Sequence, residues 1–520
     1  MSANPDTAAP TGRNKPAQGK ERGDAALGHA SQNSSPEGAK QGGELPRGWS
    51  EQRIEQLFAP LEDGRTLHQG WSPQCDKIPS PSEDVWGVLK TTSIQAGEFQ
   101  PEHNKLLPPG LEPRPMIEVK EGDILLTCAG PRVRCGVSCL VRQTRKRLMM
   151  SGKMYRFRVD VDRTDARYVE AFLQTERARQ AIDKMKTGSS DSGLNLTHER
   201  FRQLLVPVAP LPEQRRIVAE IEKQFTRLEA GVAALRRVQA NHKRYRAAVL
   251  KAACEGRLVP TEAALARSPR STKNGHPAYE TGEALLARIL TERRQNWQGR
   301  GQYKEPVAPD TTNLPPSPDG WTWASVEQIG RIETGSTPPK AETANYGNEV
   351  PLVKPGELLD YPVGKAADNL TRQGADVATT APAESVLVSC IGNLGKTALT
   401  VREVAFNQQI NAIIPTLSGT ARWTFYAVQQ RAFRQQLESV ASATTISIVN
   451  KSKFSALIVP LPPLAEQTRI VAEVERRLSV VDELESVVTA NLQRATRLRQ
   501  SILQKAFTGG LSERSMKGNY

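Results

Sequence analysis

LPEQRRIVAEIE at residues 211–222 and LAEQTRIVAEVE at residues 464–475 are two copies of one segment, and this repeat decides the fold. Nine of the twelve positions are identical. A shift of 253 residues pairs Ile217 with Ile470, and the same shift pairs Gly256 with Gly509 without a gap. The chain is therefore an internal duplication, in which two different segments are each followed by a shared one.

Each copy opens a long predicted helix. Apolar residues recur at spacings of three and four, which is typical of a helix that packs along its length against another helix. Prolines before each copy and glycines after it fit the two ends, so each helix would span ~42 residues, or ~63 Å. The residues predicted to pair the helices are Ile217, Ile221, Phe225, Leu228, Val232 and Leu235 in the first copy, and Ile470, Val474, Leu478, Val481 and Val488 in the second.

Two such apolar stripes in one chain can be buried against each other. An antiparallel pair would hold the segments that precede the helices at opposite ends of a rod. Packing of each helix on its own globular part, or on another subunit, stays open, but the equal lengths favour the intramolecular pair. The predicted fold class is α+β, with two globular α/β domains, each followed by a long helix, and an antiparallel coiled coil with pseudo-twofold symmetry.

Composition places the remaining boundaries. Residues 1–44 are rich in Ala, Gly, Pro and Ser with few large apolar side chains, which predicts a disordered arm. Gly48-Trp49 and Gly320-Trp321 open the two globular parts in the same way. The predicted divisions are a first domain at 45–210, a helix at 211–258, a connector with a short amphipathic helix at 259–313, a second domain at 314–462, a helix at 463–511 and a tail at 512–520.

Charge and cysteine usage narrow the class of protein. The formal charge of +14 favours polyanionic partners, because each Lys or Arg set against a phosphate releases a counterion. A solubilising surface, or a face that docks an acidic protein, stays open. Six cysteines in 520 residues predict buried free thiols, and the scattered histidines predict no metal site. Without an apolar run of membrane length or a secretory leader, we expect a cytoplasmic protein.

Two unlike regions, each followed by an EQxRIVAE helix, resemble the specificity subunits of type I restriction–modification systems. PLPEQRRIVAEIE and PPLAEQTRIVAEVE carry the resemblance, together with AVLKAACEGRL and SILQKAFTGGL further along each helix. It covers residues 45–511. The long arm and the Cys254-Glu255-Gly256 segment, where the second copy has Phe-Thr-Gly, depart from the pattern.

The resemblance implies a non-catalytic DNA-recognition subunit. Each globular part would be a target-recognition domain that reads one half of a split, non-palindromic sequence in double-stranded DNA. The helices would set the spacing and bind two methyltransferase subunits, and restriction subunits would complete the nuclease. S-adenosylmethionine, ATP and magnesium would belong to those partners, with no cofactor in this chain.

Sequence motifs for catalysis in this chain are weak. The segment from Cys390 to Thr397 resembles a phosphate-binding loop, but Cys390 stands where that loop needs glycine, and a strand rather than a helix follows. We predict a strand–turn–strand loop. Glu118 and Lys120 form an E-x-K pair without a second metal ligand. A coiled-coil scaffold and a non-specific DNA-binding protein remain the alternatives to sequence recognition.

Polar residues in both domains are candidates for DNA contact. A basic run at 132–158 has few opposing acids nearby, which favours phosphate contact over a merely solvated face. Side-chain amides can pair with adenine, although those at 408–411 can equally cap a strand, and the lysine turn at 393–396 can be an ordinary solvated turn. The predicted DNA-binding residues are Arg132, Arg134, Arg145, Lys146, Arg147, Lys186, Ser189 and Ser190 in the first domain, and Asn393, Lys396, Gln408, Gln409, Asn411 and Lys451 in the second.

Overall fold

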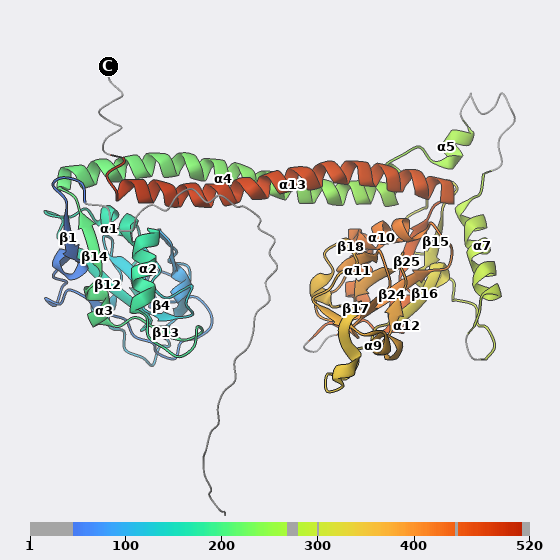
Figure 1. Ribbon diagram of the computed structural model, residues 1–520, viewed down its shortest axis with the longest axis horizontal. Helices are drawn as coiled ribbons and strands as arrows, with labels where there is room; N and C mark the ends of the chain where they lie inside the picture. The colour runs from blue at the N-terminus through green and yellow to red at the C-terminus, as the bar shows by residue number, and fades with distance from the viewer. Residues whose placement is uncertain (1–44, 268–278, 299–300, 443–445, 512–520) are drawn as a thin grey trace, which may run out of the picture.

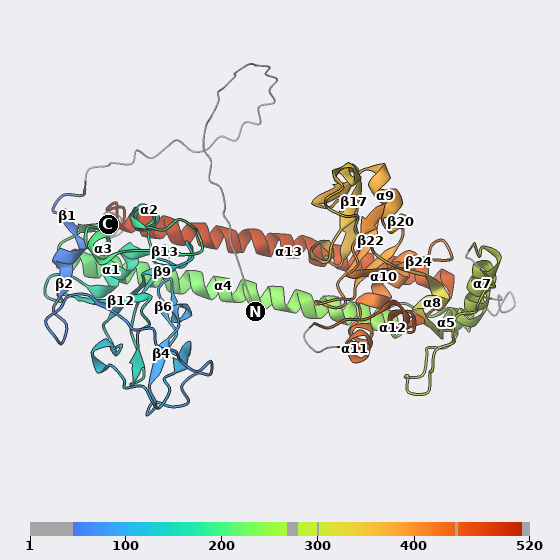
Figure 2. The ribbon, with the colours of Figure 1, turned by 90° about the horizontal axis from the view of Figure 1, so that it is seen from below.

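Two long helices form a rod that carries one globular domain below each end (Figures 1 and 2). The computed structural model describes residues 45–267, 279–298, 301–442 and 446–511; the predicted arm at 1–44 and tail at 512–520 lie outside the described residues. The rod consists of α4 (Leu211–Cys254) and α13 (Leu464–Ala506), which run antiparallel. The predicted α+β fold with paired helices is confirmed.

Proline and glycine bound both rod helices. Each helix begins directly after a proline, and Glu213 and Glu466 lie in the first turns, where a negative charge suits the helix dipole. Gly256 and Gly509 have φ angles of +66° and +81° at the far ends. A Cβ atom at either glycine would lie 2.8 Å from a proline ring of the opposite domain, so glycine is required there.

The first domain is built around a five-stranded sheet with the order β10-β8-β12-β2, in which β3 also pairs with β12. Three helices, α1 (Ala166–Leu173), α2 (Glu176–Met185) and α3 (His198–Arg202), accompany the sheet. The strands are β1 (Ser50–Arg53), β2 (Phe58–Ala59), β3 (His68–Gln69), β4 (Gly87–Leu89), β5 (Ile94–Gln95), β6 (Glu98–Phe99), β7 (Asn104–Leu106), β8 (Ile124–Thr127), β9 (Ala129–Gly130), β10 (Ser138–Leu140), β11 (Leu148–Met149), β12 (Met154–Val159), β13 (Leu194–Asn195) and β14 (Leu205–Val208).

The second domain contains two larger sheets, with the orders β16-β24-β21-β22-β18 and β19-β17-β23-β20. Its strands are β15 (Thr322–Ser325), β16 (Gly330–Thr334), β17 (Tyr346–Val353), β18 (Tyr361–Val363), β19 (Asp368–Leu370), β20 (Thr380–Ala381), β21 (Val386–Ser389), β22 (Thr397–Thr400), β23 (Val404–Phe406), β24 (Ile410–Pro415) and β25 (Ile458–Leu461). Its helices are α8 (Val326–Ile329), α9 (Arg372–Val377), α10 (Ala421–Gln429), α11 (Arg431–Val440) and α12 (Lys451–Ser455).

The two domains join their rod helices through equivalent strand pairs. Antiparallel β1 and β14 lead into α4, and antiparallel β15 and β25 lead into α13. The repeat shift relates Pro207, opposite Glu51, to Pro460, opposite Trp323. The pseudo-twofold relation seen in the helices therefore extends into both domains.

Each rod helix contributes to the cores of both domains. The start of α4 packs into the first domain through Ile217 and Ile221, and the end of α13 packs into the same core through Leu503 and Phe507. The second core likewise receives the start of α13 and the end of α4. Packing of a helix on its own domain, left open by the sequence, thus occurs together with helix pairing, and Ile217, Ile221, Ile470 and Val474 serve the domain cores.

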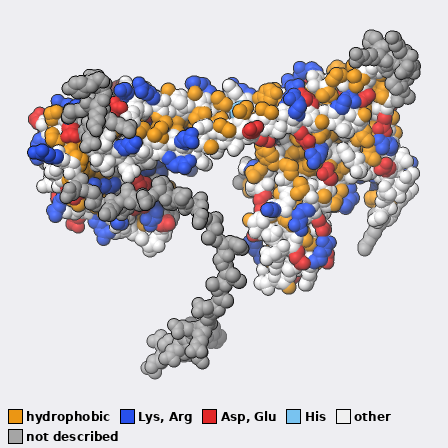
Figure 3. Space-filling model, turned by 45° about the horizontal axis from the view of Figure 1, so that its top comes forward, with side chains coloured by type: hydrophobic (Ala, Val, Ile, Leu, Met, Phe, Trp, Pro, Cys, Tyr) orange, Lys and Arg blue, Asp and Glu red, His pale blue; other side chains and the backbone are white. Residues whose placement is uncertain are grey.

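The middle of the rod is only partly buried, because two helices cannot enclose each other. Phe225 and Leu228 are half-buried, and Val480, Leu484 and Val487 are about half exposed at 53%, 48% and 53%. Apolar side chains follow the rod between the domains (Figure 3). In the described part of the chain, no helix combines the length and apolar character needed to cross a membrane.

The connector contains the predicted amphipathic helix as α7 (Gly282–Gln295), whose Leu285 and Ile289 are buried against the second domain. It also contains α5 (Glu262–Ala266), which the sequence did not predict. This short helix begins where the Thr261 hydroxyl accepts a hydrogen bond from the amide of Ala264. A helix of this length has too few apolar positions to produce a periodic signal.

Candidate DNA interface

In the second domain, four chain segments meet at one end. They are the loop 335–338 after β16, the loop 391–396 between β21 and β22, the turn 407–409 before β24, and residues 446–448 before α12. The segment from Cys390 to Thr397 is therefore a strand–turn–strand loop, as predicted. The backbone bonds that join the segments run from the amide of Gly335 to the carbonyl of Ile410, from Cys390 to Gln409, from Gly392 to Ser447, and from Val449 to Cys390, at 3.0, 2.8, 2.9 and 2.9 Å.

The first domain gathers equivalent segments. They are the loop 70–73 after β3, the loop 130–137, the turn 150–153 before β12, and the loop 187–193 before α3. The backbone bonds that join them run from Gly70 to Met154, from Trp71 to Met150, from Cys128 to Lys153, and from Leu196 to Cys128, at 3.2, 3.0, 2.9 and 2.8 Å. We call each set of four segments the loop set of its domain.

The two loop sets occupy corresponding places. The repeat shift relates Leu196 to Val449, and each donates its amide to the carbonyl of a buried cysteine, Cys128 or Cys390. β13 borders the first loop set and α12 borders the second, and both lie on the sides of the domains turned away from the rod (Figure 1). The molecule therefore presents two equivalent loop sets in the same direction.

Glycine is required at the start of each loop set. A Cβ atom on Gly70 would lie 2.3 Å from the carbonyl oxygen of Ser151, and one on Gly335 would lie 2.1 Å from that of Asn407. These contacts with backbone atoms exclude any side chain. The glycines thus hold the loops 70–73 and 335–338 tightly against the neighbouring turns.

The cysteines beneath the loop sets are structural. Burial raises the pKa of Cys128 and of Cys390 to about 12, so both thiols stay protonated at neutral pH. All six cysteines are free, and five of them are buried, as the sequence predicted, while Cys75 is partly exposed. In the described ranges, no group of three or more His, Cys, Asp or Glu side chains is arranged to hold a metal ion.

Three predicted basic contacts of the first domain are instead used inside the protein. The guanidinium of Arg134 donates to the carbonyl oxygen of Ile94 at 2.7 Å, and that of Arg145 donates to Ser82 at 2.9 Å. Burial lowers the pKa of both side chains. Lys186 has a side chain only 5% exposed, and its ammonium donates to the carbonyl of Arg132 at 2.9 Å. These three side chains therefore hold loops in place.

Acids from distant segments neutralise other members of the basic run. Arg132 pairs with Asp191 at 3.0 Å, and Arg147 lies 4.0 Å from Asp84. Arg156 is fully buried and lies 3.5 Å from an equally buried Asp123. The expectation that acids are scarce around this run is therefore wrong, because partners far away in sequence lie close in space.

The remaining first-domain candidates are exposed. Lys146 is exposed in the turn between β10 and β11, beside β4 rather than within the loop set. Ser189 and Ser190 are exposed in the loop 187–193, where the Ser190 hydroxyl lies 2.6 Å from that of Ser192. Of the predicted residues, the loop set thus brings together Arg132, Arg134 and the two serines, and Lys186 directly precedes the loop 187–193.

The second-domain candidates divide in a similar way. Asn411 is 2% exposed, and its side chain accepts a hydrogen bond from Thr334 at 2.7 Å, so it braces β24 instead of facing DNA. Gln409 accepts from Asn407 at 3.1 Å. Lys451 pairs with Glu333 at 3.2 Å. The alternative of strand capping therefore describes the amides at 409 and 411 better than base contact.

Asn393, Lys396 and Gln408 lie within one loop set. Asn393 and Gln408 are exposed, and Lys396 is half-buried. Gln408 accepts a hydrogen bond from the hydroxyl of Thr337 at 3.2 Å, which links the turn 407–409 to the loop 335–338. Ser389 holds the turn, because its hydroxyl donates to the carbonyl of Asn393 at 2.6 Å. This is the clearest cluster of exposed polar side chains among the predicted residues.

Sequence reasoning missed the loops 70–73 and 335–338. Thr337 belongs to the loop 335–338. Lys153 is an exposed lysine in the turn 150–153, which lies beside the loop 70–73. The sequence signal is the pair of segments Gly70-Trp-Ser-Pro73 and Gly335-Ser-Thr-Pro338. Each follows a strand, begins with glycine and ends with a hydroxyl residue and a proline, which is typical of a turn. Comparing the two halves upstream of the helices would have aligned them.

Comparisons with known proteins show what this chain is similar to. Residues 318–492, which span the second domain and the adjoining part of α13, match the type I restriction modification DNA specificity domain. A solved chain described under complex assembly and conformational transition of the type I R-M system superposes with a TM-score of 0.56 at 19% identity, covering 90% of this chain and 100% of that one. This likeness shows a common fold.

Curated relatives are specificity subunits. The chain is 41% identical over 182 residues to the type I restriction enzyme EcoEI specificity subunit of Escherichia coli, covering 35% of this chain and 30% of that protein. It is 21% identical over 495 residues to the EcoKI specificity subunit of Escherichia coli strain K12, covering 90% of each. The alignment thus spans about a third of the EcoEI subunit's length. The resemblance to type I specificity subunits is confirmed.

Proposed function

We propose that this chain is the subunit that selects the DNA sequence for a type I restriction–modification complex. Its two domains would read the two halves of a split target in double-stranded DNA. One observation carries the proposal: two equivalent loop sets face the same direction from the ends of a continuous two-helix rod. The domain match and the specificity-subunit relatives support the same conclusion.

The chemistry of the loop sets suits base and phosphate contacts. Amide groups such as those of Asn393 and Gln408 can form paired hydrogen bonds with adenine, and lysines such as the exposed Lys153 and the half-buried Lys396 can contact phosphates. Val133 and Ile446, which are 82% and 56% exposed, lie in the loop sets and can contact thymine methyl groups. Both kinds of contact needed for sequence recognition are therefore available.

The target would be non-palindromic and interrupted. The loop sets share backbone positions but differ in sequence, since Gly-Trp-Ser-Pro stands in one domain where Gly-Ser-Thr-Pro stands in the other. Unlike loops read unlike bases, so the two half-sites would differ. The rod would keep a constant distance between them, because both helices run from one domain to the other.

The rod would also hold the catalytic partners. Val480, Leu484 and Val487 lie at helical spacing on the surface of α13 and are about half exposed. A contiguous apolar strip of this kind is typical of a protein interface. Two methyltransferase subunits and the restriction subunits would supply catalysis, together with S-adenosylmethionine, ATP and magnesium, and this chain would contribute no catalytic residue.

Methylation mapping tests the proposal. The chain is co-expressed with a type I methyltransferase subunit that forms a stable complex with it, and methylated positions in genomic DNA are mapped by single-molecule sequencing. We expect one split motif that disappears when the chain is deleted. A stable, methyl-donor-binding complex that methylates no motif, or the same motif without this chain, would contradict sequence selection.

Substitutions in one loop set sharpen the test. We expect Asn393→Ala combined with Gln408→Ala to relax base choice in one half-site only. Ser190→Ala, in the loop set of the first domain, serves as the matched control. It should leave base choice unchanged in the half-site that the second domain reads. Equal loss at both half-sites would mean that the two domains do not read separate halves.

A further inference from the structure

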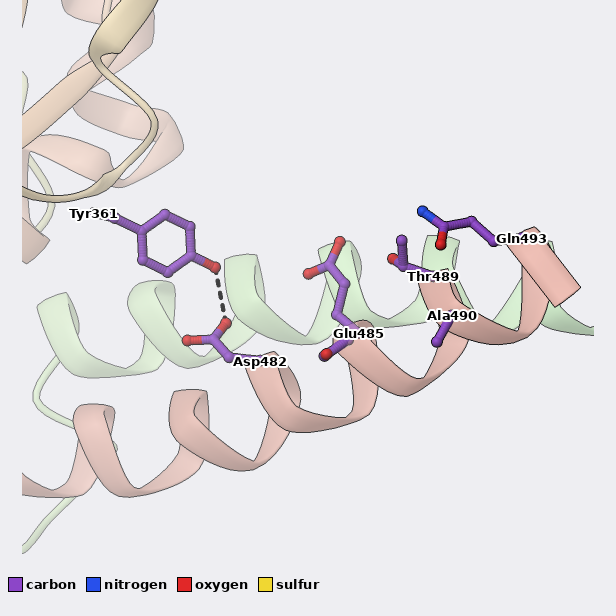
Figure 4. Close-up of a pocket in the computed structure, with 7 residues that line it drawn as sticks. Tyr361, Asp482, Glu485, Thr489, Ala490 and Gln493 are labelled. Carbon is purple, nitrogen blue, oxygen red and sulfur yellow. Dashed lines mark hydrogen bonds between the residues drawn. The ribbon is translucent and has the colours of Figure 1, made fainter. Parts of the chain in front are cut away.

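Three side chains join the second domain to both rod helices near the centre of the rod. Tyr361 begins the edge strand β18, and its hydroxyl donates to the carboxylate of Asp482 on α13 at 2.8 Å (Figure 4). Arg246 of α4 donates to the same hydroxyl at 2.7 Å and forms an ion pair with Asp482. The Arg246 guanidinium also lies 5.2 Å from the centre of the Tyr361 ring. One arginine therefore contacts a domain and the opposite helix together.

The first domain has the same arrangement at the equivalent place. The repeat shift of 253 relates Arg246 to Arg499, and it relates Glu229 to Asp482. Arg499 of α13 pairs with Glu229 of α4 at 3.2 Å and donates to the side chain of Gln174 at 3.1 Å. Gln174 is the residue that ends α1 of the first domain. Again one arginine joins two helices and one domain.

The two arrangements obey a single antiparallel register. Because each ion pair is the repeat counterpart of the other, one antiparallel register of α4 and α13 accounts for both. The domain partners are unlike, because one is a tyrosine on a strand and the other is a glutamine at the end of a helix. The ion pair recurs at both repeat-related positions, although its domain partner differs. This recurrence indicates that the contacts have a role and are not adventitious.

A second pair of contacts fixes each domain to its own helix. Arg167 of α1 pairs with Glu222 of α4 at 3.3 Å, and Arg422 of α10 pairs with Glu475 of α13. The repeat shift relates Glu222 to Glu475. Each domain is thus tied first to its own helix and then, nearer the centre of the rod, through the arginine that also crosses to the other helix.

The arginines lie where they can restrain the orientation of each domain relative to the rod. The buried joint of the second domain ends at Leu478 on α13, and Asp482 lies one turn closer to the centre. A contact outside the buried joint restrains the tilt of the domain about that joint. Ion pairs that stay partly open to solvent add little to folding stability, so we expect these contacts to act on the orientation of the domain more than on whether the chain folds.

We propose that Arg246 and Arg499 are positioning residues that set the angle at which each recognition domain is held on the rod. The inference rests on the proposed function, since that angle would fix the accepted gap between half-sites. Loss of either arginine would leave base choice unchanged and let the complex accept a gap one base pair longer or shorter. Tyr361 and Gln174 are the domain-side partners of these arginines.

The first test measures domain orientation without DNA. Spin labels are attached at Lys365→Cys in the second domain and Arg494→Cys on α13 of the full chain, in a Cys75→Ser background. We expect pulsed electron paramagnetic resonance to give a broader distance distribution for Arg246→Gln and for Tyr361→Phe than for the parent. Arg244→Gln, an exposed arginine on the same helix, is the control and should match the parent.

A charge-exchange variant distinguishes loss of the orienting ion pair from general damage to the fold. Arg246→Asp combined with Asp482→Arg restores the ion pair, so the distribution should narrow again relative to Arg246→Asp alone. Parent-like distributions for Arg246→Gln and Tyr361→Phe would overturn the proposal. So would a charge exchange that leaves the distribution as broad as in the single variant.

The second test measures gap tolerance in the complex with its methyltransferase. For Arg246→Gln and Arg499→Gln, we expect methylation of sites with a gap changed by one base pair to rise about fivefold relative to the parent target, the scale of a lost exposed ion pair. Arg497→Gln is the control for Arg499→Gln. Altered base choice with unchanged gap tolerance would overturn the proposal. A parent complex that methylates no motif would instead reject the proposed function, and the distance measurement would still report on the arginines.

Discussion

Glu62 lies among three basic side chains in the first domain. Its carboxylate accepts from Lys120 at 3.0 Å and from Arg156 at 2.5 Å, and it lies 3.5 Å from Arg158. Burial alone would raise the pKa of Glu62, but hydrogen bonds from the backbone and Lys120, together with the charges of Arg156 and Arg158, lower it to about 2. The cluster therefore stabilises the charged form.

The first prediction concerns the acid stability of this cluster. Because the folded pKa of about 2 is below the ordinary glutamate value of 4.5, the stabilisation is complete above pH 4.5 and is lost as the pH falls toward 2. Glu62→Gln should lower the free energy of unfolding by about 1 kcal/mol at pH 7, after allowance for solvent screening. It should also flatten the loss between pH 5 and pH 3. Urea unfolding at several pH values between 5 and 3 measures the free energy of unfolding, and Glu121→Gln, at an exposed residue, is the control.

The second prediction concerns a phosphate contact in the second domain. Lys396→Gln should weaken binding to all DNA sequences alike, because a lysine–phosphate contact carries no base information. The slope of log binding constant against log salt should fall by about 0.9. Titrations of the complex at several salt concentrations measure this. A change in base preference, or an unchanged slope, would remove Lys396 from the phosphate contacts.

At this scale the sequence could not predict which side chains of a basic run are exposed and which are bonded inside the protein. Arg134 and Lys146 are both basic residues within one short run, yet the guanidinium of Arg134 is bonded to buried carbonyls and the ammonium of Lys146 is exposed. Their difference depends on segments 40 or more residues away, such as the carbonyl of Ile94. Local composition contains no information about such partners.

Among the elements, the two rod helices were the most predictable. Apolar periodicity is a local property, and it located helices that the structure places at Leu211–Cys254 and Leu464–Ala506. The short strands around the loop sets were less visible, because two-residue strands such as β9 and β13 exist only through their pairing. Helix α5 was missed for the same reason of length.

The third prediction concerns the rod as a spacer. Four residues are inserted into each helix at the centre of the antiparallel register, after Arg237 in α4 and after Ala490 in α13. The insertion should lengthen the rod by about 6 Å and add one to two base pairs to the gap, at ~3.4 Å per pair. Methylation mapping of the variant complex measures the gap. An unchanged gap in a complex that still assembles would show that the rod does not set it.

At the scale of the whole molecule, the two halves are interlocked. Phe507, near the end of the chain, packs 4.8 Å from the ring centre of Tyr168 and 5.4 Å from that of Phe172 in the first domain. Its repeat counterpart Cys254 is buried in the core of the second domain. Each domain thus lacks part of its core without the helix that begins in the other.

The fourth prediction follows from this interlocking. Phe507→Ala should cost about 3–5 kcal/mol and should loosen the first domain, although residue 507 follows the second domain in sequence. Hydrogen exchange should show lost protection around β1 and α1, with the second domain unchanged. Leu498→Ala, on the same helix but 48% exposed, is the control and should cost little. Loss of protection confined to the second domain would contradict the described packing.

The shared cores also have a consequence for synthesis. A ribosome makes the first domain early, but that domain must wait for Leu503 and Phe507 before its core is complete. The second domain needs the end of α4, which is already made, and only the first turns of α13, such as Ile470 and Val474. The domain translated second is therefore the first whose core can close, and the nascent first domain remains unfinished until Phe507 has emerged.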